Sequence, residues 1–397
     1  MVISEATRVS ISGGTSRLRK MLSEGGWTEE AWPMIPQRVS VSGSVLVRSF
    51  PILGIEKYLG MPDSENRIAW FSSLKLTNDS YSTNCFLRFD PNLTDDVVIL
   101  GGKLAEGKEL KRVMTIVNKF REMTGIQTKV LIISRHIPKV EVPATAKGLG
   151  LSASAGAAIA KALIEVGAPE LRDNNRFLNV VARYLAGSAT SSAAGGFSVW
   201  LSNDGIKSED CYAVRVDDGS IDIKLVVVPI PKLITTDSAH DAATKSPLYE
   251  SWAAGKVDNV AACIEAIRAG NVDAIGKMAE ADSRMLHHLL SDGGFYNWNG
   301  ITLDLLSYVD RILRQEFNMT AYCTMDTGPS VVVITTSKDV DEVQRLVRVY
   351  LGTQGHNHPV YTADLAGSPE VLDMSQRDEL LVTSSVQEIL EGKEITL

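Results

Sequence analysis

The chain has 397 residues, of which 44% are apolar and 22% charged, a balance typical of a globular protein with a sizeable core in two or three domains. Forty Lys and Arg residues stand against 48 Asp and Glu residues, so the formal charge of −8 argues against a nucleic-acid partner. No apolar run reaches the ~20 residues that span a membrane, and the polar start lacks the apolar core of a secretory signal. Four widely separated cysteines, without a CxxC pair, argue against a zinc site and favour a reduced, cytoplasmic protein.

Elements follow in chain order from hydrophobic periodicity and from Gly and Pro breaks. Residues 1–37 form an extension with a helix predicted over 16–32 and ended by Pro33 and Pro36. Strands are predicted over 38–50, 80–89, 96–100, 129–134, 224–228, 320–325 and 330–335. Helices are predicted over 108–123, 152–166, 172–185, 256–269, 272–290, 303–317 and 340–349. Strands dominate the first part and helices the second, and this segregation predicts an α+β fold rather than a doubly wound sheet.

A glycine-rich segment precedes the helix predicted from residue 152. Gly148 and Gly150 allow a tight turn and a close approach to a ligand, and Ser152 and Ser154 can cap the helix. Free N–H groups at a helix start attract anions, so this segment is a candidate phosphate loop. It is not a Walker loop, because no Gly-Lys-Ser/Thr follows. A capped core helix with a flexible lead-in is the alternative.

Three further segments can carry chemistry. The small-residue stretch 187–200 can wrap a phosphate with hydroxyls and amides, or it can be a packed turn. Asp326 lies at the tip of a predicted hairpin turn, where an Asp often caps the turn itself. Lys57 and Tyr58 follow an apolar stretch; this Lys is a loop residue by default and would be the main cation of a site beside a phosphate.

These segments, in this order, resemble the GHMP kinase superfamily and most closely its mevalonate diphosphate decarboxylase family. The family's motifs are Lys-Tyr-Trp-Gly, Ser-Ser-Leu, a phosphate loop, a Gly-Ser-rich loop ending in Gly-Gly-Phe, Asp-Ser…His…Tyr, and Asp-Ala-Gly-Pro-Asn. The matching segments here are Lys57-Tyr58-Leu59-Gly60, Ser72-Ser73-Leu74, residues 148–156, residues 187–197, Asp282-Ser283 with His287 and Tyr296, and Asp326-Thr327-Gly328-Pro329-Ser330. The similarity extends over about residues 38–351.

The resemblance implies a GHMP-type two-domain fold with a cleft between the domains. An N-terminal domain of the ribosomal protein S5 type is expected over 38–222 and a C-terminal α+β domain over 223–397. The implied substrate is a small molecule, a phosphorylated mevalonate, and the implied assembly is a homodimer. In the family, ATP phosphorylates the tertiary 3-oxygen, and loss of that phosphate and of CO₂ creates the double bond of an isopentenyl unit.

The resemblance also implies roles for individual residues. Asp326 is the expected general base, or the carboxylate that stabilises a developing cation, and Lys57 is the cation that favours departure of the phosphate. Paired, the two would keep each other ionised. The expected substrate-binding residues are Tyr58, Lys75, Ser188, Ala189, Thr190 and Ser191, and the expected phosphate-loop residues are Lys147, Gly148, Gly150, Ser152 and Ser154. His287 and His288 are expected to pack within a helix rather than to act as acid or base.

Some positions depart from the family pattern. Ser191 stands where the family has an Arg that binds the substrate, Met61 replaces a second Lys, and Leu151 is an insertion in the phosphate loop. These changes favour the archaeal mevalonate 3,5-bisphosphate decarboxylase branch, which needs no ATP and yields isopentenyl phosphate, phosphate and CO₂. The alternatives are an ATP- and Mg²⁺-dependent decarboxylase of mevalonate 5-diphosphate or 5-phosphate, a mevalonate kinase, and an inactive binding or assembly subunit.

Overall fold

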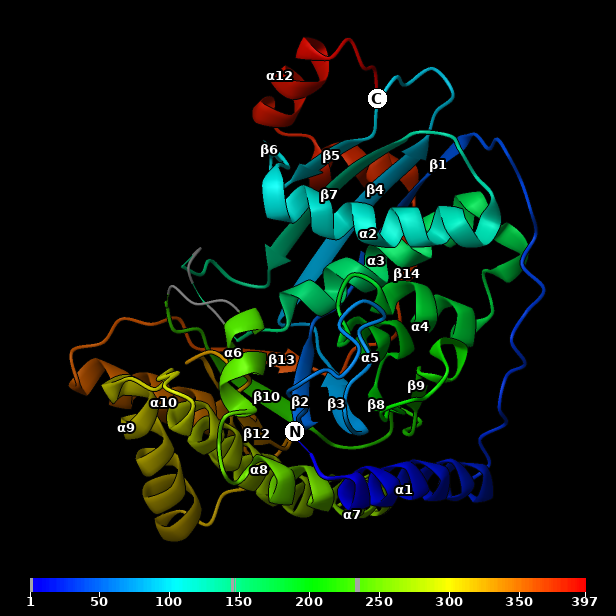
Figure 1. Ribbon diagram of the computed structural model, residues 1–397. Helices are drawn as coiled ribbons and strands as arrows, with labels where there is room; N and C mark the ends of the chain where they lie inside the picture. The colour runs from blue at the N-terminus through cyan, green and yellow to red at the C-terminus, as the bar shows by residue number, and fades with distance from the viewer. Residues whose placement is uncertain (1–2, 144–145, 147, 233–235) are drawn as a thin grey trace.

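The computed structural model describes residues 3–143, 146, 148–232 and 236–397, which form three β-sheets flanked by helices (Figure 1). The strands are β1 (Gly43–Ser49), β2 (Ile52–Glu56), β3 (Ser73–Thr77), β4 (Tyr81–Phe89), β5 (Val97–Leu100), β6 (Lys103–Leu104), β7 (Val130–Pro138), β8 (Phe197–Trp200), β9 (Ala213–Arg215), β10 (Lys224–Val228), β11 (Tyr322–Thr324), β12 (Val331–Thr335), β13 (Tyr361–Asp364) and β14 (Glu370–Leu372). The helices are α1 (Glu5–Glu24), α2 (Gly107–Thr124), α3 (Leu151–Gly167), α4 (Asn175–Arg183), α5 (Ala189–Ala194), α6 (Thr236–Ala243), α7 (Tyr249–Arg268), α8 (Val272–Asp292), α9 (Gly300–Tyr308), α10 (Val340–Thr353), α11 (Arg377–Leu381) and α12 (Ser384–Gly392). Within these ranges, no helix is long and apolar enough to cross a membrane.

The largest sheet has the strand order β14-β1-β4-β7-β5-β6, with β1, β4 and β7 antiparallel and β5 parallel to β7. The alanine-rich helix α3 packs on β1 and β4 and is buried along most of its length. Its small side chains let the helix lie close to the sheet, which gives the dense packing of a protein interior. This packing places the start of α3 against Ile52 on β2.

Helix α8 contacts both of the two smaller sheets. One has the order β2-β3-β8-β9 and the other the order β11-β12-β10-β13. Helix α8 packs against both β2 and β11, so the end of β2 comes close to the turn between β11 and β12. Lys57 follows β2, and Asp326 lies in that turn. Residues that are almost 270 positions apart therefore share one site.

Most predicted elements are present, and β10 has the predicted bounds. The first helix is an exception, because α1 occupies residues 5–24 rather than 16–32. The Ser4 hydroxyl accepts the Thr7 N–H and caps its start. The helix ends at Glu24 with Gly25 as its C-cap, and Gly26 follows with φ +93°. A second exception is the helix predicted over 303–317, where α9 continues as π-helical turns from Val309 to Glu316.

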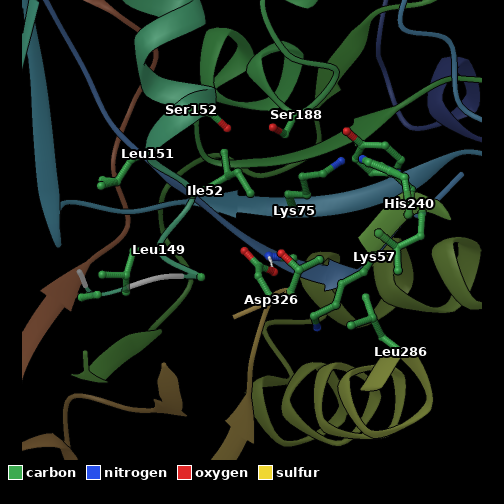
Figure 2. Close-up of a pocket in the computed structure, with 17 residues that line it drawn as sticks. Ile52, Lys57, Lys75, Leu149, Leu151, Ser152, Ser188, His240, Leu286 and Asp326 are labelled. Atoms are coloured by element: carbon green, nitrogen blue, oxygen red, sulfur yellow. Dashed lines mark hydrogen bonds between the residues drawn. The ribbon is translucent and has the colours of Figure 1, made fainter. Parts of the chain in front are cut away.

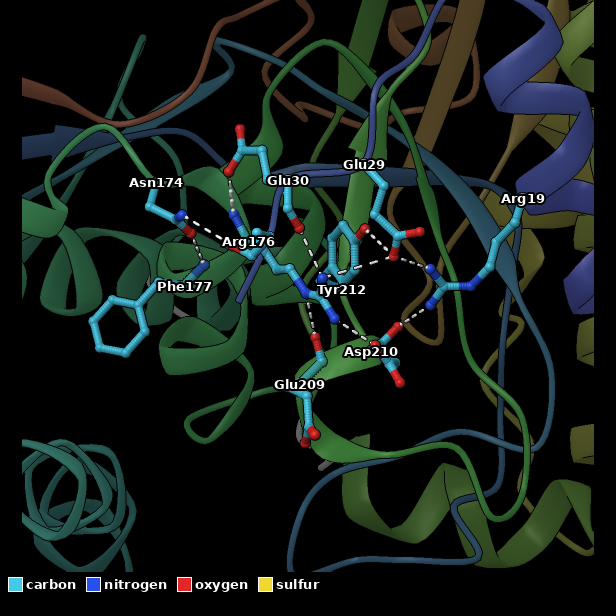
Figure 3. A network of polar contacts seen from close by, with 10 residues as sticks. Arg19, Glu29, Glu30, Asn174, Arg176, Phe177, Glu209, Asp210 and Tyr212 are labelled. Atoms are coloured by element: carbon cyan, nitrogen blue, oxygen red, sulfur yellow. Dashed lines mark hydrogen bonds and ion pairs between the residues drawn. The ribbon is translucent and has the colours of Figure 1, made fainter. Parts of the chain in front are cut away.

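The N-terminal extension is fixed to the rest of the molecule at both ends. Helix α1 lies along α7, and an extended segment then runs up the outside to β1 (Figure 1). Figure 3 shows how this segment is held: Arg176 on α4 donates to the Glu30 carbonyl at 2.7 Å and to the Asp210 carboxylate. The Tyr212 hydroxyl donates to Glu29 at 3.0 Å. The extension is therefore part of the folded core.

Replacing the central residue of this network should destabilise the fold. Arg176 is 8% exposed. We expect Arg176→Met to lower the free energy of unfolding by about 2–4 kcal/mol, because it leaves partly buried oxygen acceptors without their donor. Arg345→Met is the matched control, since Arg345 makes a surface pair with Glu342 with a side chain 59% exposed. It should change the unfolding free energy by less than about 1 kcal/mol in a urea titration; equal effects of the two variants would contradict the prediction.

The C-terminal segment returns to the large sheet. After β13 the chain crosses over, and β14 pairs antiparallel with β1, with Val371 opposite Val47. Leu381, Val386 and Leu390 then pack with Phe86 and its neighbours on a face of that sheet. Thus the end of the predicted C-terminal domain of 223–397 contacts the N-terminal sheet. The domain boundaries at 37/38 and 222/223 stay predictions.

Candidate active site

A pocket of about 240 Å³ lies where the phosphate-loop segment, β2, β3 and the β11–β12 turn meet (Figure 2). It is lined by residues from both halves of the chain. The lining residues from the first half are Ile52, Gly54, Lys57, Tyr58, Leu59, Lys75, Ala146, Gly148, Leu149, Gly150, Leu151, Ser152 and Ser188. Those from the second half are His240, Leu286, Asp326 and Thr327.

Asp326 is held in the pocket by β2 and by α8. Its Oδ1 accepts the Gly54 N–H at 3.1 Å. The Ser283 hydroxyl accepts the Met325 N–H at 2.9 Å, and His287 Nε2 lies 2.9 Å from the Asp326 carbonyl. Burial lowers the pKa of His287 to about 3, so this ring is neutral and donates through Nε2–H. His287 therefore positions the turn, in line with its predicted packing role.

The Asp326 carboxylate lies in a field of opposing effects. Burial raises its pKa above the ordinary value, while Lys57, the Gly54 N–H and Lys75 act in the opposite direction. The Lys57 ammonium donates to Thr324 Oγ1 at 2.8 Å and acts on Asp326 through space. Burial lowers the pKa of Lys57, and the charge of Asp326 opposes that effect. The two groups lie at one end of the pocket.

Lys75 presents a second cation to the pocket. Its ammonium donates to Ser73 Oγ at 2.6 Å and lies 4.9 Å from the centre of the Tyr58 ring and 5.1 Å from that of Trp200. Burial lowers the pKa of Lys75 to about 7. Figure 2 shows Lys75 and Ser188 on the wall of the pocket across from Asp326. Among the described residues this ammonium has one hydroxyl acceptor, so N–H donors are left for an anionic ligand.

Comparisons with known proteins point to one family. A family model described as "Diphosphomevalonate decarboxylase-like N-terminal domain" matches residues 49–213. A mevalonate 3,5-bisphosphate decarboxylase of Thermoplasma volcanium is 31% identical over 88% of this chain and 92% of its own. A phosphomevalonate decarboxylase of Haloferax volcanii is 30% identical over 83% of this chain and 98% of its own.

The chain belongs to the mevalonate diphosphate decarboxylase family. The fold agrees: the crystal structure of mevalonate diphosphate decarboxylase from Staphylococcus aureus has a TM-score of 0.74 at 25% identity, over 84% of this chain and 98% of its own. The enzyme from Enterococcus faecalis has a TM-score of 0.73 at 25% identity, over 84% and 100%. The predicted α+β, GHMP-type two-domain fold is confirmed, and the chain is a member of a family of carboxy-lyases that act on phosphorylated mevalonates.

The glycine-rich segment that is predicted to be a phosphate loop packs against both sides of the site. Gly148 and Gly150 have φ of +83° and +66°, which glycine adopts without strain. A Cβ on Gly150 would lie 2.2 Å from the Ile52 carbonyl, and one on Gly148 would lie 2.9 Å from Gly328 Cα. Ser152 lines the pocket, whereas the predicted residue Lys147 lies outside the described residues.

Other predicted contacts are not brought to the pocket. The stretch after Ser188 forms the short helix α5, which packs against α3 and α4. Ala189, Thr190 and Ser191 on it are fully buried and do not line the pocket, so the structure does not bring them to the site and their substrate contacts stay a prediction. Ser154 is buried as well and bonds to the Leu151 carbonyl at 2.9 Å. Gly150 occupies the cap position of α3, so the prediction that serines cap this helix is wrong.

His240 is a pocket residue that the sequence pattern did not indicate. Its Nδ1 accepts the Gly60 N–H at 2.9 Å, and its ring centre lies 5.5 Å from that of Tyr58. It comes from α6, about 180 positions after Tyr58, and no local motif marks it. Leu286 lies on the buried face of α8 and also lines the pocket. Helical periodicity predicts that such a leucine is buried, but it does not predict that it borders this pocket.

Gly54 packs against the side chains of both catalytic candidates, Lys57 and Asp326. A Cβ at this position would lie 2.6 Å from Lys57 Cγ and 2.9 Å from Asp326 Oδ1. We expect Gly54→Ala to lower kcat about tenfold or more, because one of the two side chains must move away. Gly352→Ala is the control, since a Cβ there meets no atom within 4 Å. Steady-state kinetics with an unchanged kcat for Gly54→Ala would refute this expectation.

Proposed function

We propose that the protein converts mevalonate 3,5-bisphosphate to isopentenyl phosphate, phosphate and CO₂ without ATP. The observation that carries this proposal is one pocket with a carboxylate, Asp326, and two buried ammonium groups, Lys57 and Lys75. The name of the Thermoplasma volcanium relative supports the same substrate.

In the proposed reaction the bond between C3 and its ester oxygen breaks, and the electron pair leaves with the phosphate. The pair of the C1–C2 bond then forms the C2=C3 double bond, and C1 departs as CO₂. Positive charge develops at C3, and a carboxylate fixed beside that carbon stabilises it. Asp326 has this role, and Lys57 stabilises the phosphate that leaves. Lys75, opposite Asp326, binds a second anionic group of the substrate.

Two features support the proposal that ATP is not used. The pocket of about 240 Å³ lies just below the ~300–1,000 Å³ range of most small-molecule sites, a size that suits a compact phosphorylated acid by itself. Asp326 is the one carboxylate among the described residues that line the pocket. Mg²⁺ in nucleotide sites is held by one or two carboxylates together with phosphates. Because the proposal assigns Asp326 to C3, the described lining leaves no second carboxylate to hold the ion.

ATP-dependent decarboxylation of mevalonate 5-diphosphate or 5-phosphate is the second candidate. The left-handed glycines at the start of α3 favour it, since a glycine turn before a helix is an anion site. In that case the loop from Gly148 to Ser152 would hold the nucleotide phosphates, and Asp326 would deprotonate the 3-hydroxyl. The Haloferax volcanii relative is named phosphomevalonate decarboxylase.

One assay separates these candidates. The purified protein is incubated with mevalonate 3,5-bisphosphate, 5-diphosphate or 5-phosphate, each with and without ATP and Mg²⁺, and CO₂, phosphate and ADP are measured. The proposal predicts CO₂ and phosphate from the bisphosphate alone, in equal amounts. No CO₂ from the bisphosphate overturns it; CO₂ together with ADP from either 5-phosphorylated substrate supports the second candidate. A phosphorylated product without CO₂ would indicate a kinase.

The predicted homodimer and cytoplasmic location stay predictions, which sedimentation and cell fractionation would test.

A further inference from the structure

A buried ion cluster lies behind the Lys57 end of the pocket. Lys256 on α7 is fully buried, and its ammonium donates to Glu56 Oε2 at 2.8 Å and to the Asp282 carboxylate. The ammonium also lies 4.3 Å from the centre of the Trp252 ring, which adds a cation–π contact. Neither the family-like motifs nor the pocket lining includes Lys256.

Both carboxylates that Lys256 binds act on Lys57. Asp282 Oδ2 accepts the Lys57 backbone N–H at 2.7 Å, while its Oδ1 accepts the Trp252 Nε1–H at 2.9 Å. Glu56 precedes Lys57 in the chain and ends β2. The segment that carries the Lys57 ammonium is thus tied to α7 and α8 through an ion pair with Lys256.

The charges of the cluster and of the pocket balance. Three cations meet three carboxylates: Lys57, Lys75 and Lys256 with Glu56, Asp282 and Asp326. Loss of Lys256 would leave a net negative charge in a poorly solvated region that must accept a substrate with several negative charges. An unpaired buried carboxylate is strongly unfavourable, and the segment that carries it tends to move.

We propose that Lys256 is a positioning residue, which neutralises Glu56 and Asp282 so that they hold Lys57 in its working place beside Asp326. The inference deepens the proposed function and rests on it for the reaction, but the placement of Lys57 can be measured without any substrate.

The titratable groups around Lys57 determine whether each substitution raises or lowers its pKa. Burial lowers the pKa of Lys57, Asp282 and Asp326 raise it, Lys256 lowers it further and Glu56 raises it. Burial raises the pKa of Glu56 to about 7, against the attraction of Lys256. Among the described residues, Lys75 on β3, Asn259 and the Cys263 thiol on α7, and His287 on α8 also face the cluster or Lys57.

The kinetic test uses Lys256→Met, Glu56→Gln and the double variant, with Lys161→Met as the control. Lys161 pairs with Glu165 on α3, away from the cluster. We expect Lys256→Met to lower kcat at least 30-fold and to move both limbs of the pH profile of kcat/KM to higher pH, since a cation is lost. Glu56→Gln should move them to lower pH. The double variant restores the charge balance, so its kcat should be at least tenfold higher than that of Lys256→Met.

A second readout does not depend on the reaction. The pKa of Lys57 is measured by ¹³C NMR of protein with labelled lysine ε-carbons, and its signal is assigned with Lys57→Met. We expect a higher pKa of Lys57 in Lys256→Met and a lower one in Glu56→Gln. If Lys256→Met does not fold, Glu56→Gln and the double variant give the same two comparisons.

The outcomes separate the two proposals. A lower melting temperature of Lys256→Met with an unchanged pH profile and an unchanged pKa of Lys57 would assign Lys256 a structural role only and overturn the inference. An unchanged pKa of Lys57 in Glu56→Gln would also overturn the inference. If the wild-type protein acts on none of the mevalonate phosphates, the proposed function fails, and the NMR titration still decides whether Lys256 positions Lys57.

Discussion

Asp326→Asn is expected to lower kcat about 1,000-fold or more while the protein stays folded. An amide has the shape of the carboxylate but neither its negative charge nor its basicity. It can therefore neither stabilise positive charge at C3 nor accept a proton from a 3-hydroxyl. This result is expected for ATP-independent and ATP-dependent decarboxylation alike, so it tests the catalytic assignment itself.

Stability should change little in this variant. Burial raises the pKa of Asp326, which means that the fold favours the neutral carboxyl over the charged one. At neutral pH, where the carboxylate would be ionised in the unfolded chain, a neutral side chain should be tolerated or even stabilise the fold. Asp96→Asn is a control for which the opposite result is expected, because Asp96 pairs with Arg121 at 2.7 Å and lies away from the pocket. It should lower the melting temperature and leave kcat unchanged; substantial turnover by Asp326→Asn would remove Asp326 from the mechanism.

Lys75→Met should raise KM about 30- to 150-fold, because a charge-assisted hydrogen bond to substrate is worth about 2–3 kcal/mol. The pH dependence gives a sharper test. With a pKa of about 7, Lys75 carries its full charge below that pH and loses it above. KM of the wild-type protein should therefore rise between pH 6 and 8 beyond the change that ionisation of the substrate produces. The variant should lack this additional rise.

Steady-state kinetics across this pH range provide the measurement. Lys224→Met is the matched control, since Lys224 pairs with Asp364 at 2.6 Å near the surface. The control should keep the KM and the pH dependence of the wild-type protein. An unchanged KM in Lys75→Met at pH 6 would show that this ammonium does not bind the substrate.

The sequence by itself determined the α+β class, most helices and strands, and the family. Periodicity and Gly or Pro breaks are local properties, so they identify elements such as β10 and α8 without tertiary information. The order of short motifs around Lys57, Gly148 and Asp326 was enough to indicate a decarboxylase of phosphorylated mevalonates. These motifs are local as well, because the backbone of a phosphate loop or a hairpin turn depends on neighbouring residues.

Only the tertiary structure decided which side chains reach the pocket. Ser188 lines it and Ser191 does not, because Ser188 precedes helix α5 whereas Ser191 lies within it and is buried. The Lys57 N–H bonds to Asp282 across 225 positions, and Lys256 joins the same cluster from another helix. Contacts over such separations depend on how sheets and helices pack, and no periodicity along the chain encodes them. The charge balance around Lys57 is therefore a property of the packed molecule rather than of any segment.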